Sequence, residues 1–231
     1  MAGVLGDAKL EALLARLQAE SKAQEPETPA YFQSRAAAGR TDFSFMDAGD
    51  HAHFADKLVA LEPDKAEFCY GLCRAIGARR VVEFGTSFGV STLYLAAAVR
   101  DNCGAIAGGG VVIGTEHETT KAKAARANFA AAGLSEFIEL REGDLRETLK
   151  DLAGPIDFAL FDVWTEMARP GLELIAPHLR QGAVICADNT AQPRARAGYA
   201  DYFAFIADPS NGLRTMTLPF EGGFEMTVKV A

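Results

Sequence analysis

The sequence predicts a doubly wound α/β domain built on a mostly parallel sheet of seven strands. From Arg80 onward, short and almost wholly apolar runs alternate with helical patterns. Runs of this kind are typical of parallel strands whose two faces are both covered by helices. The last two runs are separated by Glu221, Gly222 and Gly223, a connection that predicts an antiparallel hairpin at the C-terminus.

Composition narrows the class of protein. The chain has 231 residues, which suits a single globular domain, and its net charge of −8 disfavours a nonspecific nucleic-acid binder. No apolar stretch approaches the roughly 20 residues that a membrane span needs. The N-terminus has no basic region followed by an apolar one, so we expect a cytoplasmic protein. From the net charge we expect it to act on a small molecule. The four cysteines form no metal pattern, and we expect reduced, mostly buried thiols.

The first 60 residues form a separate segment in this interpretation. Leucines at helical spacing predict a helix from Ala8 to about Ala23, which covers the chain's own active site or packs on a second subunit. Residues 36–55 lack periodicity and suggest a loop or lid. We therefore divide the chain into an N-terminal helix with a lid or dimerisation segment, 1–60, and a main domain, 61–231, and expect a homodimer.

The main domain begins with a helix between Pro63 and Gly77, because proline favours a helix start and glycine a helix end. Strand and helix patterns then alternate in order. The expected strands are 80–84, 110–116, 137–143, 156–164, 182–189, 213–220 and 223–231, and the expected helices between them are 90–98, 119–133, 145–153 and 167–180.

Polar residues stand where the predicted parallel strands end. In an open parallel sheet, ligands bind beyond the carboxyl ends of the strands, so these residues are candidates for a binding site. They are Glu83 with the turn from Gly85 to Gly89, Glu116, Gly143 with Asp144, Asp162, and Asp188 with Asn189.

The glycine turn and the acid after it have a specific chemical meaning. Gly85 and Gly89 let the backbone approach a ligand closely, and the following helix N-terminus, near Ser91, offers free N–H groups to an anion. Glu116 is placed to accept hydrogen bonds from ribose hydroxyls. The alternative is that the turn is only a tight connection between a strand and a helix.

Five motifs in order resemble one family. "VVEFGTSFGVST", "GTEHETTKAKAARANFAAAG", "LREGDLRETL", "DFALFDVW" and "ICADN" are similar to the class I S-adenosylmethionine-dependent O-methyltransferases of the catechol and caffeoyl-CoA group. The similarity runs from about Leu61 to the C-terminus. It implies a Rossmann-like methyltransferase fold with an antiparallel final strand, S-adenosylmethionine as cofactor, and a small, aromatic hydroxyl compound as substrate.

The resemblance also implies roles for individual residues. Around the methionine part of the cofactor it places Glu83, Gly85, Thr86, Ser87, Gly89 and Ser91, with Asp162 near the amine. It assigns Glu116 to the ribose and His117, Gly143, Asp144 and Leu145 to the adenine.

In metal-dependent members of this group, the residues at Asp162, Asp188 and Asn189 bind one divalent ion. Mg²⁺ prefers oxygen ligands of this kind, and it would lower the pKa of a bound hydroxyl. The alternative is that Asp188 and Asn189 only end a strand and cap a turn.

One position departs from the family pattern. Metal-dependent relatives carry a lysine as general base where this chain has Thr165. Asp162 and the neighbouring Glu166 are our candidate catalytic residues, and His51 and His53 are further candidates. Trp164 forms either a wall for a planar substrate or part of the core.

Two other functions stay open. A protein that binds S-adenosylmethionine without methyl transfer is suggested by Thr165. A nicotinamide-dependent dehydrogenase is disfavoured, because the glycines are spaced G-x-x-x-G and no Tyr-x-x-x-Lys pair is present.

Overall fold

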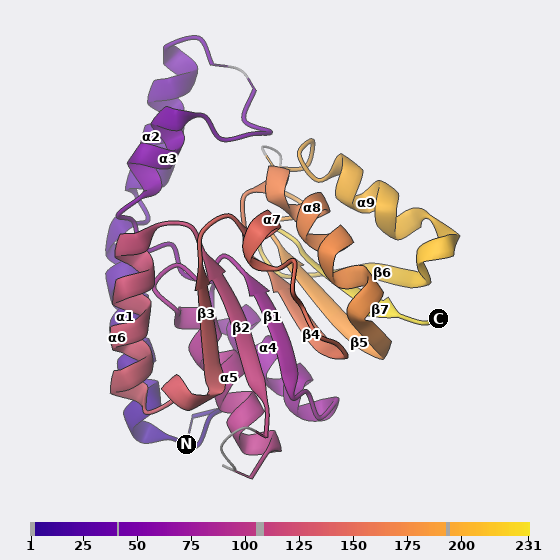
Figure 1. The fold of residues 1–231 in the computed structure, drawn as a ribbon. Helices are drawn as coiled ribbons and strands as arrows, with labels where there is room; N and C mark the ends of the chain where they lie inside the picture. The colour runs from indigo at the N-terminus through magenta and orange to yellow at the C-terminus, as the bar shows by residue number, and fades with distance from the viewer. Residues whose placement is uncertain (1–2, 41, 105–108, 193–194) are drawn as a thin grey trace.

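The computed structural model describes residues 3–40, 42–104, 109–192 and 195–231. These residues contain one seven-stranded sheet in the order β3-β2-β1-β4-β5-β7-β6 (Figure 1). The first five strands are parallel, and β7 runs antiparallel to both β5 and β6. The predicted doubly wound domain and its C-terminal hairpin are therefore confirmed. The strands are β1 Arg80–Phe84, β2 Val111–Glu116, β3 Ile138–Glu142, β4 Ile156–Phe161, β5 Leu179–Asp188, β6 Leu213–Leu218 and β7 Phe224–Lys229.

Helices cover both faces of the sheet. On one face, α4, α5 and α6 pack in a core that includes Val81, Val112 and Phe158, whereas α7, α8 and α9 pack on the other face against Val82, Ile113 and their neighbours. The described helices are α1 Ala8–Gln24, α2 Glu27–Ala37, α3 Ala48–Phe54, α4 Pro63–Ala75, α5 Val90–Asn102, α6 Thr119–Ala132, α7 Leu145–Thr148, α8 Thr165–Ile175 and α9 Ala200–Ala207.

The leading helix packs on its own chain. Leu10, Leu14 and Leu17 of α1 are buried in the same core as α5, and α1 lies beside α6 (Figure 1). Asp7 accepts a hydrogen bond from the backbone N–H of Leu10 and thereby caps the helix start. The helix therefore packs on the main domain of its own chain, and its packing on a second subunit stays a prediction.

The segment expected to be a loop or lid contains helical structure. Helix α2, Glu27–Ala37, lies almost wholly before the expected segment of residues 36–55, whereas α3, Ala48–Phe54, lies within it; the stretch between the two helices has no regular structure where it is described. The expectation missed α3 because seven residues are too few to show a helical period. Its signal lay in Asp47 and Asp50, which form a capping box. Both helices extend from the carboxyl end of the sheet (Figure 1), and we call residues 27–54 the helical cap.

Smaller differences concern the ends of elements. β5 begins at Leu179, three residues before the expected Gly182, and α7 is a single turn where a nine-residue helix was expected. The four cysteines are free and buried, which confirms the reading of their spacing. No helix within the described ranges is long and apolar enough to cross a membrane.

Candidate functional site

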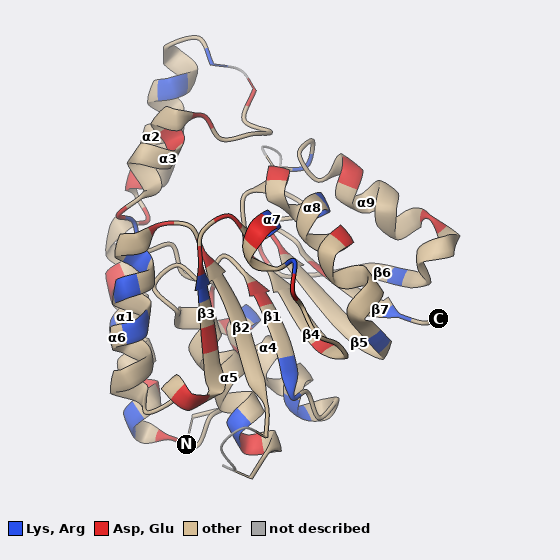
Figure 2. Ribbon diagram, viewed as in Figure 1, with Lys and Arg blue, Asp and Glu red and all other residues tan. Residues whose placement is uncertain are grey.

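The strand register brings the predicted site residues to one edge of the sheet. Phe84 of β1 lies level with Thr115 of β2 and with Phe161 of β4. The residues that follow these positions, Gly85, Glu116 and Asp162, therefore lie side by side. Figure 2 shows acidic residues in the loops at this carboxyl edge.

Glu83 stabilises the glycine turn from inside the protein. Its side chain is fully buried and accepts hydrogen bonds from the hydroxyls of Thr86, Ser91 and Thr92, at 2.9 Å from Thr86 and 2.7 Å from Ser91. Burial raises the pKa of Glu83, although these hydroxyls work in the opposite direction. Because both of its oxygens are engaged by the protein, Glu83 fixes the shape of the turn and the start of α5.

The two glycines of the turn are required by its geometry. Gly85 has φ +92° and Gly89 has φ +86°, a region that side chains disfavour. A Cβ atom at position 85 would overlap the carbonyl oxygen of Asp162, and one at position 89 would overlap the ring of Phe129. Only glycine lets the turn pass this close to the end of β4 and to α6.

Glu116 is joined to the same turn by hydrogen bonds. Its carboxylate accepts one from the backbone N–H of Ser87 at 2.7 Å and one from that of Glu118 at 2.8 Å. Ser87 has φ +50°, and its buried hydroxyl has no hydrogen-bond partner among the described residues. A buried hydroxyl without a partner is costly, so this atom is a candidate contact for a bound ligand.

The third strand end lies next to Glu116. The backbone N–H of Gly143 donates to the carbonyl of Glu116 at 2.9 Å. Asp144 caps α7 and pairs with Arg146, whose hydrogen bond lowers the pKa of the Asp144 carboxyl. Leu145 is buried, whereas His117 is exposed.

A small pocket opens between the turn and a chain segment that sequence reasoning missed. It is lined by Leu58 to Leu61 on one side and by the turn with Asp162 on the other; the predicted cofactor residues among its walls are Gly85, Thr86, Ser87, Ser91 and Asp162. Segment 58–61 has no regular secondary structure and no charged side chain, so only its position identifies it.

The N-terminal helix α1 holds this segment in place. Gln18 donates to the carbonyl of Leu61 at 2.8 Å, and Gln24 accepts from the backbone N–H of Leu58 at 3.0 Å. Ser21 accepts from the N–H of Ala60 at 3.1 Å. One polar stripe of α1 thus supports the wall of the pocket.

Asp162 and Asp188 form a second cluster at the ends of β4 and β5. Burial raises the pKa of Asp162 well above its usual value, and the charge of Asp188 acts in the same direction. Burial also raises the pKa of Asp188 to about 6, against the opposing effect of Lys65. Two acids and one lysine therefore share a poorly solvated site.

Two of the three predicted metal-binding residues, Asp188 and Asn189, have their side-chain oxygens engaged by the protein. Asp188 Oδ1 accepts from Lys65 Nζ at 2.6 Å, and Asp188 Oδ2 accepts from Asn189 Nδ2 at 2.6 Å. The amide oxygen of Asn189 accepts from Gln192. Within the described residues, no group of three or more His, Cys, Asp or Glu side chains is arranged to hold a metal ion. The residues present do not fit a magnesium site.

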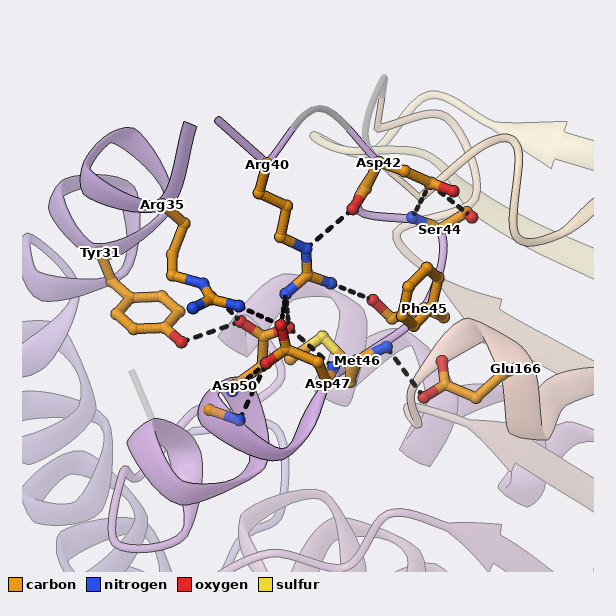
Figure 3. A network of polar contacts seen from close by, with 11 residues as sticks. Tyr31, Arg35, Arg40, Asp42, Ser44, Phe45, Met46, Asp47, Asp50 and Glu166 are labelled. Carbon is orange, nitrogen blue, oxygen red and sulfur yellow. Dashed lines mark hydrogen bonds and ion pairs between the residues drawn. The ribbon is translucent and has the colours of Figure 1, made fainter. Parts of the chain in front are cut away.

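The start of α8 holds the helical cap against the main domain. Thr165, at the family's lysine position, donates its hydroxyl to the carbonyl of Ser44 at 2.9 Å. Glu166 Oε1 accepts from the N–H of Met46 at 3.2 Å, and its buried Oε2 has no partner among the described residues (Figure 3).

The helical cap is itself cross-linked by charge. Asp50 is fully buried and pairs with Arg40, and it accepts a hydrogen bond from the hydroxyl of Tyr31 at 2.8 Å. Arg35 and Arg40 also pair with Asp47 (Figure 3). This network joins α2 to α3.

Aromatic rings line the junction between the cap and the main domain. Phe54 packs against Trp164 with ring centroids 5.2 Å apart, so Trp164 contacts the cap. His53 stacks on Tyr31 at 3.8 Å, and its buried Nε2 has no partner among the described residues, whereas His51 is exposed.

The aromatic residues after Asn189 are mainly packing residues. Tyr199 and Tyr202 are buried, and Phe203 and Phe205 pack against the same core. Tyr199 also donates its hydroxyl to the carbonyl of Asp188 at 2.8 Å, which fixes the end of β5.

Comparison with known proteins agrees with this geometry. Residues 82–190 match the family model described as a methyltransferase domain. A catechol O-methyltransferase of Mycobacterium tuberculosis is 33% identical over 132 residues, which are 57% of this chain and 57% of that enzyme. The chain thus spans less than two-thirds of the length of the curated relatives it matches.

Two solved structures share the fold. The cofactor-bound protein Rv0187 from MTB has a TM-score of 0.69 and 24% identity, over 97% of this chain and 91% of that one. The O-methyltransferase from Bacillus cereus, in complex with SAH, has a TM-score of 0.66 and 23% identity, over 96% of this chain and 91% of that one.

Proposed function

We propose that the protein is an S-adenosylmethionine-dependent O-methyltransferase, because residues 82–190 match the family model of a methyltransferase domain. It transfers the sulfonium methyl group of the cofactor to a hydroxyl of a small aromatic molecule. The observation that carries the proposal is the convergence of the glycine turn, Glu116 and Asp162 on one edge of the sheet, where a pocket opens beside the turn and Asp162.

The roles of the cofactor residues follow from their positions. Ser87 and Ser91 face the pocket beside the N-terminus of α5, where an anionic carboxylate is favoured. Asp162 would pair with the cofactor's amine. Glu116 would accept hydrogen bonds from the ribose hydroxyls with the remaining lone pairs of its carboxylate, which two backbone N–H groups hold at this edge.

The adenine would lie farther along the same edge. Gly143 is bonded to the backbone of Glu116, and Leu145 offers an apolar contact next to it. His117 and Asp144 complete this end of the site. This assignment agrees with the order in which the strands bring these residues together.

The acceptor would enter between the cap and the main domain. Trp164 and Phe54 supply flat apolar surface there, which suits an aromatic ring. When the acceptor oxygen attacks the methyl carbon in line with the breaking S–C bond, a proton must leave the hydroxyl. Glu166 is our candidate acceptor of that proton, because its Oε2 is buried without a partner among the described residues.

Magnesium was expected from the motif of Asp162, Asp188 and Asn189. Because the donors of Asp188 and Asn189 are engaged by Lys65 and by neighbouring amides, no step of the proposed reaction passes through a metal ion. A cytoplasmic homodimer with no nucleic-acid or membrane partner remains part of the proposal; the net charge of −8 disfavours nonspecific nucleic-acid binding.

A protein that binds the cofactor without methyl transfer is the second candidate. The observation that favours it is Thr165, whose hydroxyl is used to hold the cap. Calorimetric titration with S-adenosylmethionine and S-adenosylhomocysteine, followed by a methyl-transfer assay on catechols, separates the two. Micromolar binding with turnover supports the enzyme, and binding without turnover on any hydroxyl compound supports the second candidate. If neither cofactor form binds, both proposals fail.

A further inference from the structure

Lys65 is a charged residue in an unusual position. It lies in the first turn of α4, and its side chain is only 1% exposed. Lysine is almost never this buried unless its ammonium is paired. Lys65 Nζ lies 2.6 Å from Asp188 Oδ1 and 2.9 Å from Glu62 Oε2, and it sits 5.9 Å from the ring centroid of Phe224.

The ammonium engages an oxygen that a divalent ion at this edge would need as a ligand. A divalent ion needs several oxygen ligands around it, each at roughly 2.0 to 2.6 Å. Asp188 Oδ1 is taken by Lys65, Asp188 Oδ2 by Asn189, and the Asn189 amide oxygen by Gln192. An ion bound to Asp188 would also lie within a few ångströms of the Lys65 charge and be repelled by it.

The charge of Lys65 is maintained by its neighbours. The carboxylates of Asp188 and Glu62 lie 2.6 Å and 2.9 Å from its Nζ and favour the charged ammonium over the neutral amine. The lysine therefore supplies positive charge beside Asp188, at the end of β5.

We propose that Lys65 is a tethered cation that replaces the divalent ion at the edge formed by Asp162 and Asp188. The protein consequently binds its cofactor and holds this edge without a metal, and Lys65 excludes divalent ions from it. The inference concerns the site of the proposed methyl transfer, but its test measures metal binding and so does not depend on turnover.

The test is a titration with Mn²⁺, in which electron paramagnetic resonance measures the concentration of the free ion. Calorimetry measures the binding of Mg²⁺ in the same way. The wild-type protein should show no saturable binding at this site up to millimolar metal. Lys65→Gln and Lys65→Met remove the charge and should gain a site at least tenfold tighter than any in the wild type. Lys65→Arg and the exposed-surface control Lys150→Gln should behave as the wild type does.

A second substitution locates the gained site. Adding Asp188→Asn to Lys65→Gln should abolish the gained Mn²⁺ binding, and thermal unfolding checks that each variant is folded. Saturable Mn²⁺ binding by the wild type that Asp188→Asn removes would overturn the inference. A folded Lys65→Gln protein that gains no metal site would also overturn it. Should both neutral variants fail to fold, the wild-type titration alone decides.

Metal independence has a second measurement that needs no variant. The affinity of the wild type for S-adenosylmethionine should be the same within twofold in Mg²⁺ and in EDTA. A change of tenfold or more would contradict a metal-free site. If the cofactor does not bind under either condition, the proposed function fails while the Mn²⁺ result still stands.

Discussion

Gly85 and Asp162 are in such close contact that no side chain fits between them. The backbone N–H of Asp162 donates to the carbonyl of Phe84 at 3.0 Å, and a Cβ atom on residue 85 would overlap the Asp162 carbonyl oxygen. The glycine turn and the end of β4 are therefore one rigid unit, which sets the distance between the turn and the Asp162 carboxyl.

Gly85→Ala should therefore lower the free energy of unfolding by more than the cost of the left-handed backbone conformation alone. The left-handed conformation costs alanine about 1 to 2 kcal/mol, and overpacking adds about 1 to 3 kcal/mol. Gly133→Ala is the matched control, since Gly133 has φ +70° with no atom within 4 Å of an added Cβ. Urea unfolding of both variants measures the difference, and equal losses would show that the contact with Asp162 is not restrictive.

Glu116→Gln should weaken binding of S-adenosylmethionine. The substitution keeps the size of the side chain but removes the charge that we expect to face the ribose hydroxyls. Loss of charged hydrogen bonds costs about 1.5 to 3 kcal/mol, or roughly one to two orders of magnitude in Kd. Calorimetric titration measures the Kd. The control is Glu136→Gln, at an exposed glutamate in the short 3-10 helix Ser135–Phe137. An unchanged Kd would remove Glu116 from the cofactor site.

Thr165→Val should loosen the helical cap without unfolding the sheet. The variant keeps the shape of threonine and loses the hydrogen bond to the Ser44 carbonyl, which contributes about 0.5 to 1.5 kcal/mol. Hydrogen exchange in residues 42–47 should become faster. Thr120→Val, at an exposed threonine, is the control. If exchange in the cap is the same in both variants, Thr165 does not hold it.

Asp50→Asn should disrupt the ionic network of the cap. Removing one partner of a buried ion pair costs about 3 to 5 kcal/mol, because the other charge is left uncompensated. Because Asp50 joins α2 to α3, the loss should destabilise these two helices. Hydrogen exchange should therefore become faster across residues 27–54, while the strands stay protected. Asp56→Asn, on an exposed side chain, should have no such effect. Loss of protection throughout the sheet would show that the cap and the main domain unfold together.

Asp157→Asn should remove part of the acid sensitivity of the fold. Burial alone would raise the pKa of Asp157, but the hydrogen bond from Arg180 and those from the N–H groups of Arg79 and Arg80 outweigh it and lower the pKa. A carboxylate with a lowered pKa stabilises the folded state above its usual pKa of 3.8, and this stabilisation is lost as the pH falls through the lowered value.

At neutral pH the free energy of unfolding of the Asp157→Asn variant should be about 1 to 3 kcal/mol below that of the wild type. We expect a value near the lower end, because the Arg180 side chain is partly exposed to solvent. The difference from the wild type should shrink as the pH falls below about 4. Urea unfolding at pH 7 and pH 3 measures it. A difference that is independent of pH would assign the effect to packing and not to the charge.

The sheet and the edge that carries the site could be predicted from the sequence. Val81 and Val82 face opposite sides of a covered strand, and both are buried, so the run had to be apolar throughout. Because parallel strands end at one edge, Glu116 and Asp162 had to lie near Gly85, although they are far apart in the chain.

The sequence by itself determined the strands, the glycine turn and the acids at the strand ends, because these depend on periodicity and on local backbone requirements. Only the tertiary structure decided that Leu58 to Leu61 wall the pocket, that Thr165 holds Ser44, and that Lys65 pairs with Asp188 across 123 positions of chain. Each of these contacts joins two segments that are far apart in the sequence, and no periodic pattern links the two. The residues become neighbours only when the helices and loops pack against the sheet.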